Sequence, residues 1–322
     1  MKKSILAIAV VAASIAAPAA IAAPTVYGNI HLSISDQDTK NDIDMESNTS
    51  AIGVKGSEDL GDGMKAIYKA EWQADIADGG SNGAGTSALT KRDQFVGLKG
   101  GMGTVKFGTM SSNYKQKGGK VDSLYRTRLE GRGMLHTQSR LHNGRDINRG
   151  RITNAVQYAS PKMGGIQLVA NATFSNNENE TTGVGVRYAT KTFMAYLDWI
   201  DTIPGGASIA TGDTESAVKV GGKFKSKAFH VAGQFESAED VTGYDYIHVN
   251  AGFKINKNNS VQVTAGQASH VTNSAADTQS FAVAFNHKLS KMTNVYVGYG
   301  DKSSDTVALE DDILTFGIKK KF

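Results

Sequence analysis

Hydrophobic and polar side chains alternate along almost the whole chain after its first two dozen residues. In residues 166–174 an apolar or small side chain occupies every second position, from Ile166 to Phe174. A period of two is the period of a β-strand, in which successive side chains point to opposite faces. The same alternation recurs in residues 151–158, 184–188, 193–199, 218–225 and 229–236. The pattern therefore predicts an all-β protein whose strands each have one apolar face.

The breaks between these segments alternate in length. Tight breaks fall at residues 58–63, 100–103, 161–165, 225–227, 256–259 and 289–291. Longer polar breaks fall at residues 36–48, 75–91, 111–150, 175–182, 201–216, 238–242, 270–279 and 302–310. We count sixteen strand-like segments, the first at Thr25–Ser35 and the last at Asp312–Phe322. Short turns at one end, long loops at the other and an even strand count are typical of a transmembrane β-barrel, which satisfies every backbone polar group inside lipid.

A soluble β-sandwich or a β-solenoid is the alternative interpretation. Sandwich domains usually hold ~100 residues, and the sequence shows no fixed short repeat of the solenoid kind. The final segment favours the barrel, because Leu314, Phe316 and Ile318 form an apolar row that only Lys320 interrupts before Phe322. A lysine near the end of a strand can reach the lipid headgroups. We therefore expect a sixteen-stranded antiparallel transmembrane β-barrel.

Residues 1–22 have the composition of a secretory signal peptide. The basic pair Lys2-Lys3 precedes thirteen apolar or small residues, Ile5–Ala17, and Ala20-Ile21-Ala22 offers the small residues of a cleavage site. A membrane anchor is the alternative, but a transmembrane span needs ~18 apolar residues. We expect cleavage at the end of this segment, which leaves a barrel domain of 300 residues, 23–322. The sequence thus predicts an exported protein.

Composition narrows the chemistry that the chain can carry. It has no cysteine, which excludes disulfides, cysteine-ligated zinc, iron–sulfur clusters and thiol catalysis. A mean hydropathy of −0.30 excludes a bundle of transmembrane helices. The sequence has no phosphate-binding loop, zinc-protease motif or nucleophile elbow, and we cannot assemble the Ser/His/Asp set that a barrel protease or lipase needs. We expect no enzymatic activity, no metal, no cofactor and no nucleic-acid partner.

The long break at residues 111–150 carries the strongest local anomaly of charge. Between Ser111 and Arg151 there are ten basic and three acidic residues, a net charge of +7 against about −5 for the rest of the mature chain. Charged side chains that line a pore set its ion preference, and low-dielectric walls focus their field. The segment therefore predicts a moderate anion preference if it lies in a lumen. Two alternatives stay open: its arginines pair with wall carboxylates such as Glu71, Asp198 and Glu236, or part of it faces solvent or lipopolysaccharide phosphates.

Six segments together resemble the general diffusion porins of Gram-negative outer membranes. They are Val26–Gly28, Gly53–Gly61, Arg92–Gly100, Gly103–Gly108, Arg151–Pro161 and the terminal Phe322, and they span nearly the whole mature chain. The resemblance implies a homotrimer in outer-membrane lipid and lipopolysaccharide, with passive diffusion of small hydrophilic solutes and ions through each barrel. It implies that the third loop, 111–150, folds inward as a constriction. It also implies that Phe322 is read by the barrel-assembly machinery.

The resemblance further implies a basic wall cluster opposite the third loop. Arg92, Arg151 and Lys55 resemble its members. The chain departs from the family pattern in two places, since Ala51 stands where many relatives have another wall arginine and the loop lacks an acidic Pro-Glu-Phe type motif. These departures leave the cluster thinner and the facing loop less acidic than in such relatives.

Strand parity adds lumen candidates to that cluster. With Tyr68 and Phe107 toward lipid, Lys69 and Lys106 face inward, and a slip of one residue in register would reverse both assignments. The candidate pore-lining and selectivity residues are Lys55, Lys69, Arg92, Lys106, Lys115, Lys117, Lys120, Asp122, Arg126, Arg128, Glu130, Arg132, Arg140 and Arg151. The sequence therefore predicts an outer-membrane porin, and a substrate-preferring anion or phosphate channel is the alternative.

Overall fold

The computed structural model describes residues 23–40, 42–77, 89–135, 141, 150–174, 181–202 and 215–322. The predicted signal peptide and its cleavage point after Ala22 therefore lie outside the described residues. The strands are β1 (Thr25–Gln37), β2 (Asp42–Ser47), β3 (Ala51–Gly61), β4 (Met64–Ala74), β5 (Leu89–Gly100), β6 (Gly103–Ser111), β7 (Arg151–Ala159), β8 (Ile166–Thr173), β9 (Thr182–Ala189), β10 (Phe193–Thr202), β11 (Glu215–Lys225), β12 (Phe229–Ala238), β13 (Tyr244–Lys254), β14 (Asn259–His270), β15 (Thr278–Lys288), β16 (Thr293–Ser304) and β17 (Asp311–Lys321).

Helices are few and short in the described part of the chain. The α-helices are α1 (Asn113–Gly118), α2 (Gly131–Met134) and α3 (Glu239–Thr242), and single 3-10 turns lie at Asp38–Lys40, Ser274–Ala276 and Val307–Leu309. None of these helices is long and apolar enough to cross a membrane.

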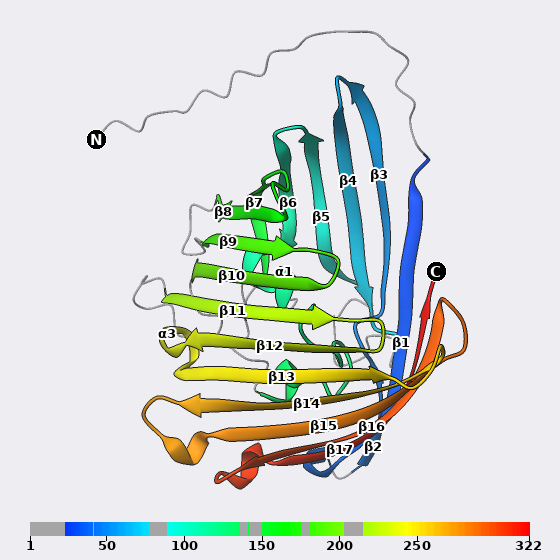
Figure 1. Ribbon diagram of the computed structural model, residues 1–322, viewed down its shortest axis with the longest axis vertical. Coiled ribbons are helices and arrows are strands. Elements are labelled where there is room, and N and C mark those ends of the chain that lie inside the picture. Colours follow the sequence, from blue (N-terminus) through cyan, green and yellow to red (C-terminus); the bar gives the residue numbers. More distant parts are fainter. Residues whose placement is uncertain are drawn as a thin grey trace.

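The strands close into a barrel, in which the first strand β1 and the last strand β17 lie side by side (Figure 1). From β3 to β17 each strand pairs antiparallel with the next, and β17 pairs back with β1 from Asn29–Lys321 to Gln37–Ile313. β2 and β3 follow one another along the same edge of β1, so the seventeen strand elements form sixteen strands of wall. The predicted sixteen-stranded antiparallel barrel is confirmed.

β2 lies inside the segment that the sequence analysis assigned to a polar loop, residues 36–48, so that assignment was wrong in part. Its side chains alternate, with Ile43 and Met45 exposed on the outer face and Asp44 and Glu46 at positions of the inner face. Asp, and to a lesser degree Glu, are depleted in strands, and the three acidic residues of this segment therefore favoured a loop. Pairing with β1 overrides that local preference.

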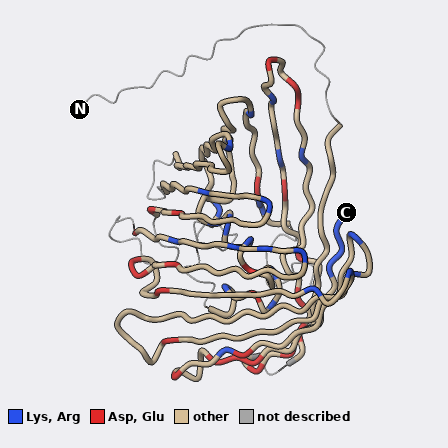
Figure 2. Tube along the Cα trace, viewed as in Figure 1, with Lys and Arg blue, Asp and Glu red and all other residues tan. Residues whose placement is uncertain are grey.

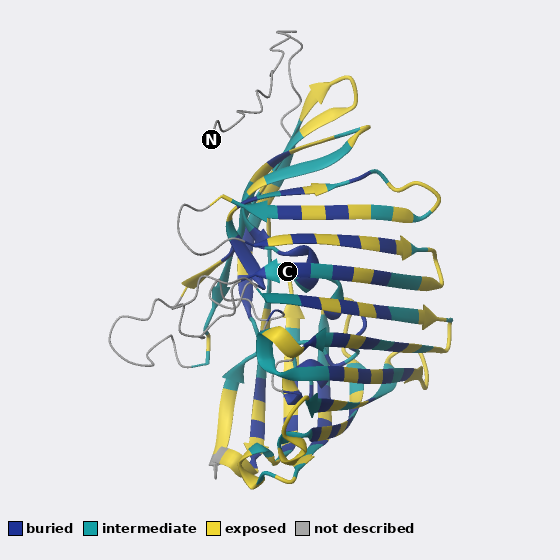
Figure 3. Ribbon diagram, turned by 90° about the vertical axis from the view of Figure 1, so that its left-hand side faces the viewer, coloured by how far each residue is buried: buried dark blue, intermediate teal, exposed yellow. Residues whose placement is uncertain are grey.

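The outer face of the wall is apolar and the inner face is polar. Figure 3 shows buried and exposed residues in alternate bands along the strands. On β17 the exposed residues are Leu314, Phe316 and Ile318, at 55%, 52% and 42%, while Thr315 between them is buried. The parity inferred from the sequence is therefore the parity of the wall. An apolar exterior with a polar interior is the arrangement of a barrel whose solvent is lipid.

The turn between β3 and β4 is tighter than the predicted break at residues 58–63. The strands run to Gly61 and begin again at Met64, so Asp62 and Gly63 alone form the turn. Both have positive φ, 48° and 73°, which matches the right-handed twist of a two-residue hairpin.

The barrel is sealed where Phe322 meets Gly28. Their backbones exchange two hydrogen bonds, N to O, each 3.1 Å long. The Phe322 ring covers Gly28 so closely that a Cβ built at residue 28 would lie 2.4 Å from the ring and 2.5 Å from the carbonyl oxygen of Ala51. Since the backbone oxygen cannot move aside, residue 28 accepts only glycine.

We predict that Gly28→Ala lowers the yield of folded barrel severalfold, because overpacking of this kind costs about 1–3 kcal/mol at the final strand pairing. Heat-modifiable mobility on gels after refolding measures the folded fraction. Gly101→Ala is the control, since a Cβ at residue 101 has nothing within 4 Å. Equal folded yields for the two variants would contradict the prediction.

Candidate functional site

The third loop, between β6 and β7, folds against the inner wall, and the largest buried apolar contacts lie there. Tyr114, Leu135 and Leu141 of the loop pack on Ala and Ile side chains of β10, β11, β12 and β14. Leu129 and Met134 pack beside Gly298 and Gly300 of β16. Small residues on the wall thus let the loop approach closely, which holds the loop inside the barrel.

α1 is fixed to the wall by buried polar contacts. Its N-cap Ser112 accepts a hydrogen bond from the backbone of Lys115. The Asn113 side chain donates to Asp198 of β10 at 3.1 Å and to two strand carbonyls, and Tyr114 Oη donates to Glu236 of β12 at 2.8 Å. Fully buried Lys219 of β11 donates to the Tyr114 carbonyl oxygen. Burial makes these contacts costly to break.

The rest of the loop is held by charge. Arg128 pairs with Glu46 of β2, and Arg132 pairs with Glu130 of the loop itself. Asp122 accepts hydrogen bonds from the backbone of Leu124 and Arg132. Loop arginines therefore do pair with carboxylates, as one alternative interpretation of the sequence supposed. The carboxylates used by Arg128 and Arg132 are not the wall residues it named.

A β-bulge creates the charged cluster on the opposite wall. Ala70 pairs with Gln94 and Trp72 with Lys91, so Arg92 and Asp93 together oppose one residue of β4. A bulge re-aims side chains in this way. Both consecutive residues, one cationic and one anionic, therefore contribute to the inner face.

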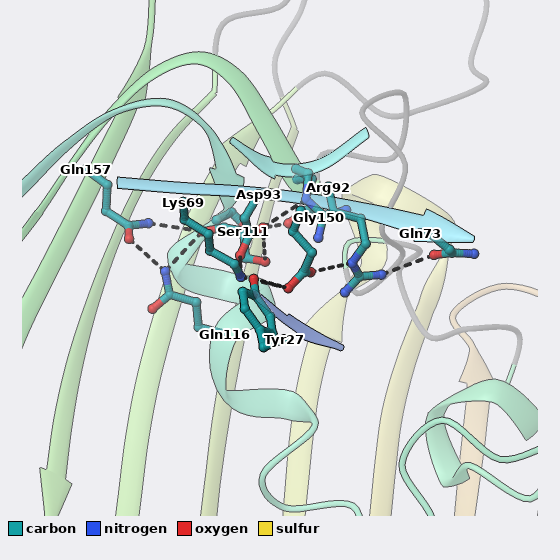
Figure 4. Close-up of polar contacts among 12 residues, drawn as sticks. Tyr27, Lys69, Gln73, Arg92, Asp93, Ser111, Gln116, Gly150 and Gln157 are labelled. Atoms are coloured by element: carbon teal, nitrogen blue, oxygen red, sulfur yellow. Dashed lines mark hydrogen bonds and ion pairs between the residues drawn. The ribbon is translucent and has the colours of Figure 1, made fainter. Parts of the chain in front are cut away.

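On β4, Glu71 lies between Ala70 and Trp72 and opposes the bulge. The charged residues around it form a chain of ion pairs, which Figure 4 shows. Arg92 Nε lies 2.6 Å from Glu71 Oε1, and Lys69 Nζ lies 3.0 Å from both Glu71 and Asp93. Asp93 also binds Arg151 Nε at 3.0 Å. Tyr27 donates to Glu71 at 2.8 Å. Two carboxylates are thus shared among three cations.

A cavity of about 300 Å³ separates the third loop from β1 and β3–β6. Five basic and two acidic residues line it: Lys69, Arg92, Lys106, Lys115 and Arg126 against Glu71 and Asp93. Ala51 also lines it, at the position where the sequence departs from the family pattern. The cavity therefore has an excess of positive charge on both its wall side and its loop side.

The predicted site residues differ in where they lie relative to the cavity. Lys69, Arg92, Lys106, Lys115 and Arg126 line the cavity. Lys55 lies beside it, with Nζ 4.7 Å from the Tyr27 ring centroid, and Arg151 is buried behind it at 1% exposure. Asp122 and Arg132 are buried between loop and wall, and Arg128 and Glu130 pair with other residues. Lys117 and Lys120 lie at the end of α1 and just beyond it, and Arg140 lies outside the described residues.

Sequence reasoning missed Asp93, Tyr27, Gln116 and Tyr125, all of which line the cavity. Gln116 donates to Gln157 of β7 at 2.8 Å and so ties α1 to the wall beside the cluster. Asp93 follows Arg92 directly, and strict alternation would point it outward. Only the bulge turns the Asp93 side chain inward, and nothing in the local sequence predicts the bulge.

The positive charge of the loop depends on pH near neutrality. Burial lowers the pKa of Lys117 to about 8, with help from nearby Arg187 and Lys120. Burial and nearby Glu130 raise the pKa of Asp122 to about 7. Between pH 6 and pH 9 the first group loses a positive charge and the second gains a negative one.

We therefore predict that any anion preference weakens as pH rises from 6 to 9. Reversal potentials at fixed salt gradient measure this change. Lys117→Met should remove the part of the change near pH 8 and leave the part near pH 7. A preference that is constant over this range would show that these two groups do not act on the permeating ions.

The fold and this inner site define a membrane-spanning β-barrel with a loop inside its lumen. Residues 7–306 match the Gram-negative porin family. The chain belongs to that family and is an outer-membrane protein.

Individual relatives agree with this assignment. The chain is 31% identical over 209 residues to major outer membrane protein P.IB of Neisseria gonorrhoeae, and the match covers 61% of this chain and 56% of that protein. It is 36% identical over 134 residues to the P.IB protein of Neisseria lactamica, covering 38% and 37% of the two chains. The chain thus matches 56% of the length of the first relative and 37% of the length of the second.

Solved structures show the same fold at low identity. An anion-selective porin from Comamonas acidovorans superposes with a TM-score of 0.77 and 18% identity, covering 93% of this chain and 99% of that one. The trimer form of OmpT of Vibrio cholerae gives a TM-score of 0.67 and 15% identity, covering 93% and 99%.

Proposed function

We propose that this protein is a diffusion porin that passes small hydrophilic solutes and ions across the outer membrane, with a moderate preference for anions. The lining of the loop cavity carries this proposal, since five cations and two carboxylates face the same space. Charged side chains at a constriction set ion preference, and the low-dielectric wall focuses their field. The solved relative named as anion-selective has the same fold.

The internal ion pairs limit the size of the preference. Glu71 and Asp93 neutralise part of the charge of Lys69, Arg92 and Arg151. The uncompensated charge is then carried mainly by Lys106 and Arg126, which make no ion pair with any residue that the structure describes. A preference of moderate size follows, rather than strict exclusion of cations.

Reversal potentials across a KCl gradient in planar bilayers test the proposal. We expect stepwise conductance increments on insertion and a reversal potential of the sign that chloride permeation gives. A cation-selective reversal potential would overturn the anion preference and leave the porin function intact. Absence of conductance in folded protein would overturn both, and a block by millimolar phosphate would favour the substrate-preferring channel.

We propose in addition that the protein acts as a homotrimer without enzymatic activity. The solved OmpT relative described as a trimer form supports the oligomeric state, and relatives named as outer-membrane proteins and porins support the non-enzymatic role. The proposal extends to residues 1–22 as a cleaved signal and Phe322 as the assembly signal. Native mass measurement in detergent tests the trimer, and N-terminal sequencing of outer-membrane protein tests the cleavage site.

A further inference from the structure

The turn-side half of the barrel carries lysines on its inner face. On β11, Lys223 and Lys225 share the inward parity of Lys219, and Lys223 donates to the Lys120 carbonyl oxygen of the third loop at 3.4 Å. On β13 the inward row Tyr246, His248 and Asn250 is buried and ends at Lys254. Further turn-side lysines on inward positions are Lys65, Lys99, Lys288, Lys319 and Lys321. The wall below the loop is therefore cationic.

Acidic residues are scarce at that end in the part of the chain that the structure describes. Asp59 is the one carboxylate on an inward turn-side position, and it lies 3.6 Å from Lys65. The turns at residues 160–165, 190–192, 226–228, 255–258 and 289–292 contain lysine but no Asp or Glu. The turn between β3 and β4 is the exception, since it contains Asp62 and follows Glu58, which has outward parity. This end of the lumen consequently has little internal compensation of its charge.

The loop-side end of the barrel has the opposite charge, as Figure 2 shows by its red segments at the ends of strands away from the turns. On strands, the acidic residues there with inward parity are Asp44, Glu46, Glu215 and Asp311, whereas Asp36, Asp201, Asp301 and Asp312 have outward parity. Further acidic residues at this end lie in loops and short helices: Asp38, Glu239, Asp240, Asp277, Asp305 and Glu310. Outside the wall cluster and the third loop, the basic residues at these described ends are Lys40, Lys91 and Lys302. The lumen thus runs from an acidic mouth through the constriction to a lysine-lined vestibule.

We infer that this axial separation of charge makes the channel an ionic rectifier, which conducts more current in one direction than in the other. The inference rests on the proposed porin function and concerns its directionality. Mobile cations gather at the acidic mouth and mobile anions at the lysine vestibule, because fixed charges in a narrow low-dielectric lumen concentrate ions of opposite sign. Each ion species therefore has one mouth through which it enters readily.

The sign of the effect follows from those two entrances. With the loop side positive, cations are driven in through the acidic mouth and anions through the lysine vestibule, so both species fill the lumen. With the loop side negative, each ion species must enter through the mouth whose fixed charges have the same sign as the ion. The concentration of mobile ions in the lumen then falls. Conductance is then higher with the loop side positive.

Ionic strength controls the size of the rectification. The Debye length is about 10 Å at 0.1 M salt and about 3 Å at 1 M. At 0.1 M the fields of the wall residues overlap across the lumen, and we expect a current ratio of about 2 between opposite voltages of equal size. At 1 M the ratio falls toward unity, since each charge is screened near the wall.

The test is the current–voltage curve of oriented channels in planar bilayers at 0.1 M and 1 M KCl. Orientation is read from Val307→Cys, because the chain has no other cysteine and Val307 is 77% exposed in the loop between β16 and β17. A maleimide coupled to a polymer too large to pass through the pore, added to one chamber, labels the protein only from the loop side. Recovery of labelled protein then assigns the sign of the voltage.

A matched pair of triple variants separates lumen charge from total charge. Lys225→Gln, Lys254→Gln and Lys319→Gln together remove three inward lysines and should bring the ratio at 0.1 M close to unity. The control removes three neighbouring lysines that lie on turns or on the outer face, through Lys227→Gln, Lys257→Gln and Lys320→Gln. This control should rectify like the parent.

The outcomes distinguish the inference from the function beneath it. Conducting channels with symmetrical currents at 0.1 M would overturn the inference while the porin function stands, and so would rectification of the opposite sign. Rectification that survives in the inward triple variant would also overturn it. If folded protein did not conduct at all, the proposed porin function itself would be overturned.

Discussion

Replacement of Lys106 and Arg126 by glutamine is expected to reduce the permeability ratio of chloride over potassium by about tenfold, the equivalent of ~1.4 kcal/mol. Both residues line the loop cavity, one from the wall and one from the loop. The interaction energy of a unit charge with an ion 4 Å away is about 1 kcal/mol in bulk water, and it is larger inside a narrow lumen. Reversal potentials of the double variant measure the change.

These two residues suit the experiment because their replacement leaves no carboxylate without its partner cation. Neither forms an ion pair with any described residue, and Lys106 instead lies 5.0 Å from the ring centroid of Phe95. Lys162→Gln with Lys191→Gln is the matched control, since it removes the same charge from two exposed turns. An unchanged ratio in the cavity variant, or an equal change in the control, would contradict a local role for the cavity charges.

Replacement of Lys219 by methionine is expected to loosen the third loop from the wall. Lys219 is fully buried and lies directly between Asp198 and Glu236 in the strand register. It also donates to the Tyr114 carbonyl oxygen, and its ammonium lies 4.0 Å from the Tyr114 ring centroid. Removal of one partner from a buried charge network costs about 3–5 kcal/mol, because the remaining charges stay desolvated.

The loosened loop should fluctuate between positions in the lumen. Single-channel records of the variant are expected to show frequent partial closures, and trypsin should cut the loop in the folded barrel. Lys225→Met is the control, as it lies on the same strand and the same inward face but is exposed. A variant that is as quiet and as protease-resistant as this control would show that apolar packing alone holds the loop.

Much of the fold could be predicted because its signal is local. Alternation of apolar and polar side chains depends only on each strand having one face in lipid. Val184, Val186 and Phe316 can therefore be assigned to the outer face without knowledge of the strands beside them. The exception was β2, whose residues Asp42–Ser47 have low strand propensity and form a strand only because β1 lies beside them.

The site was less accessible to sequence reasoning. Parity located Lys69 and Lys106 on the inner face, but it could not find Asp93, which the bulge opposite Glu71 turns inward. Nor could it tell that Arg132 is buried with Glu130 while Arg126 lines the cavity.

By itself, the sequence determined the number of strands, the face each strand turns to lipid and the basic character of the third loop. These properties follow from the period of a strand and from composition, and both can be read from the order and type of the residues alone. Tertiary structure alone decided which charges neutralise each other, such as Arg128 with Glu46, 82 residues apart. Pairing of charges depends on strand register, bulges and the path of a folded loop, and those arise only when the barrel closes around it.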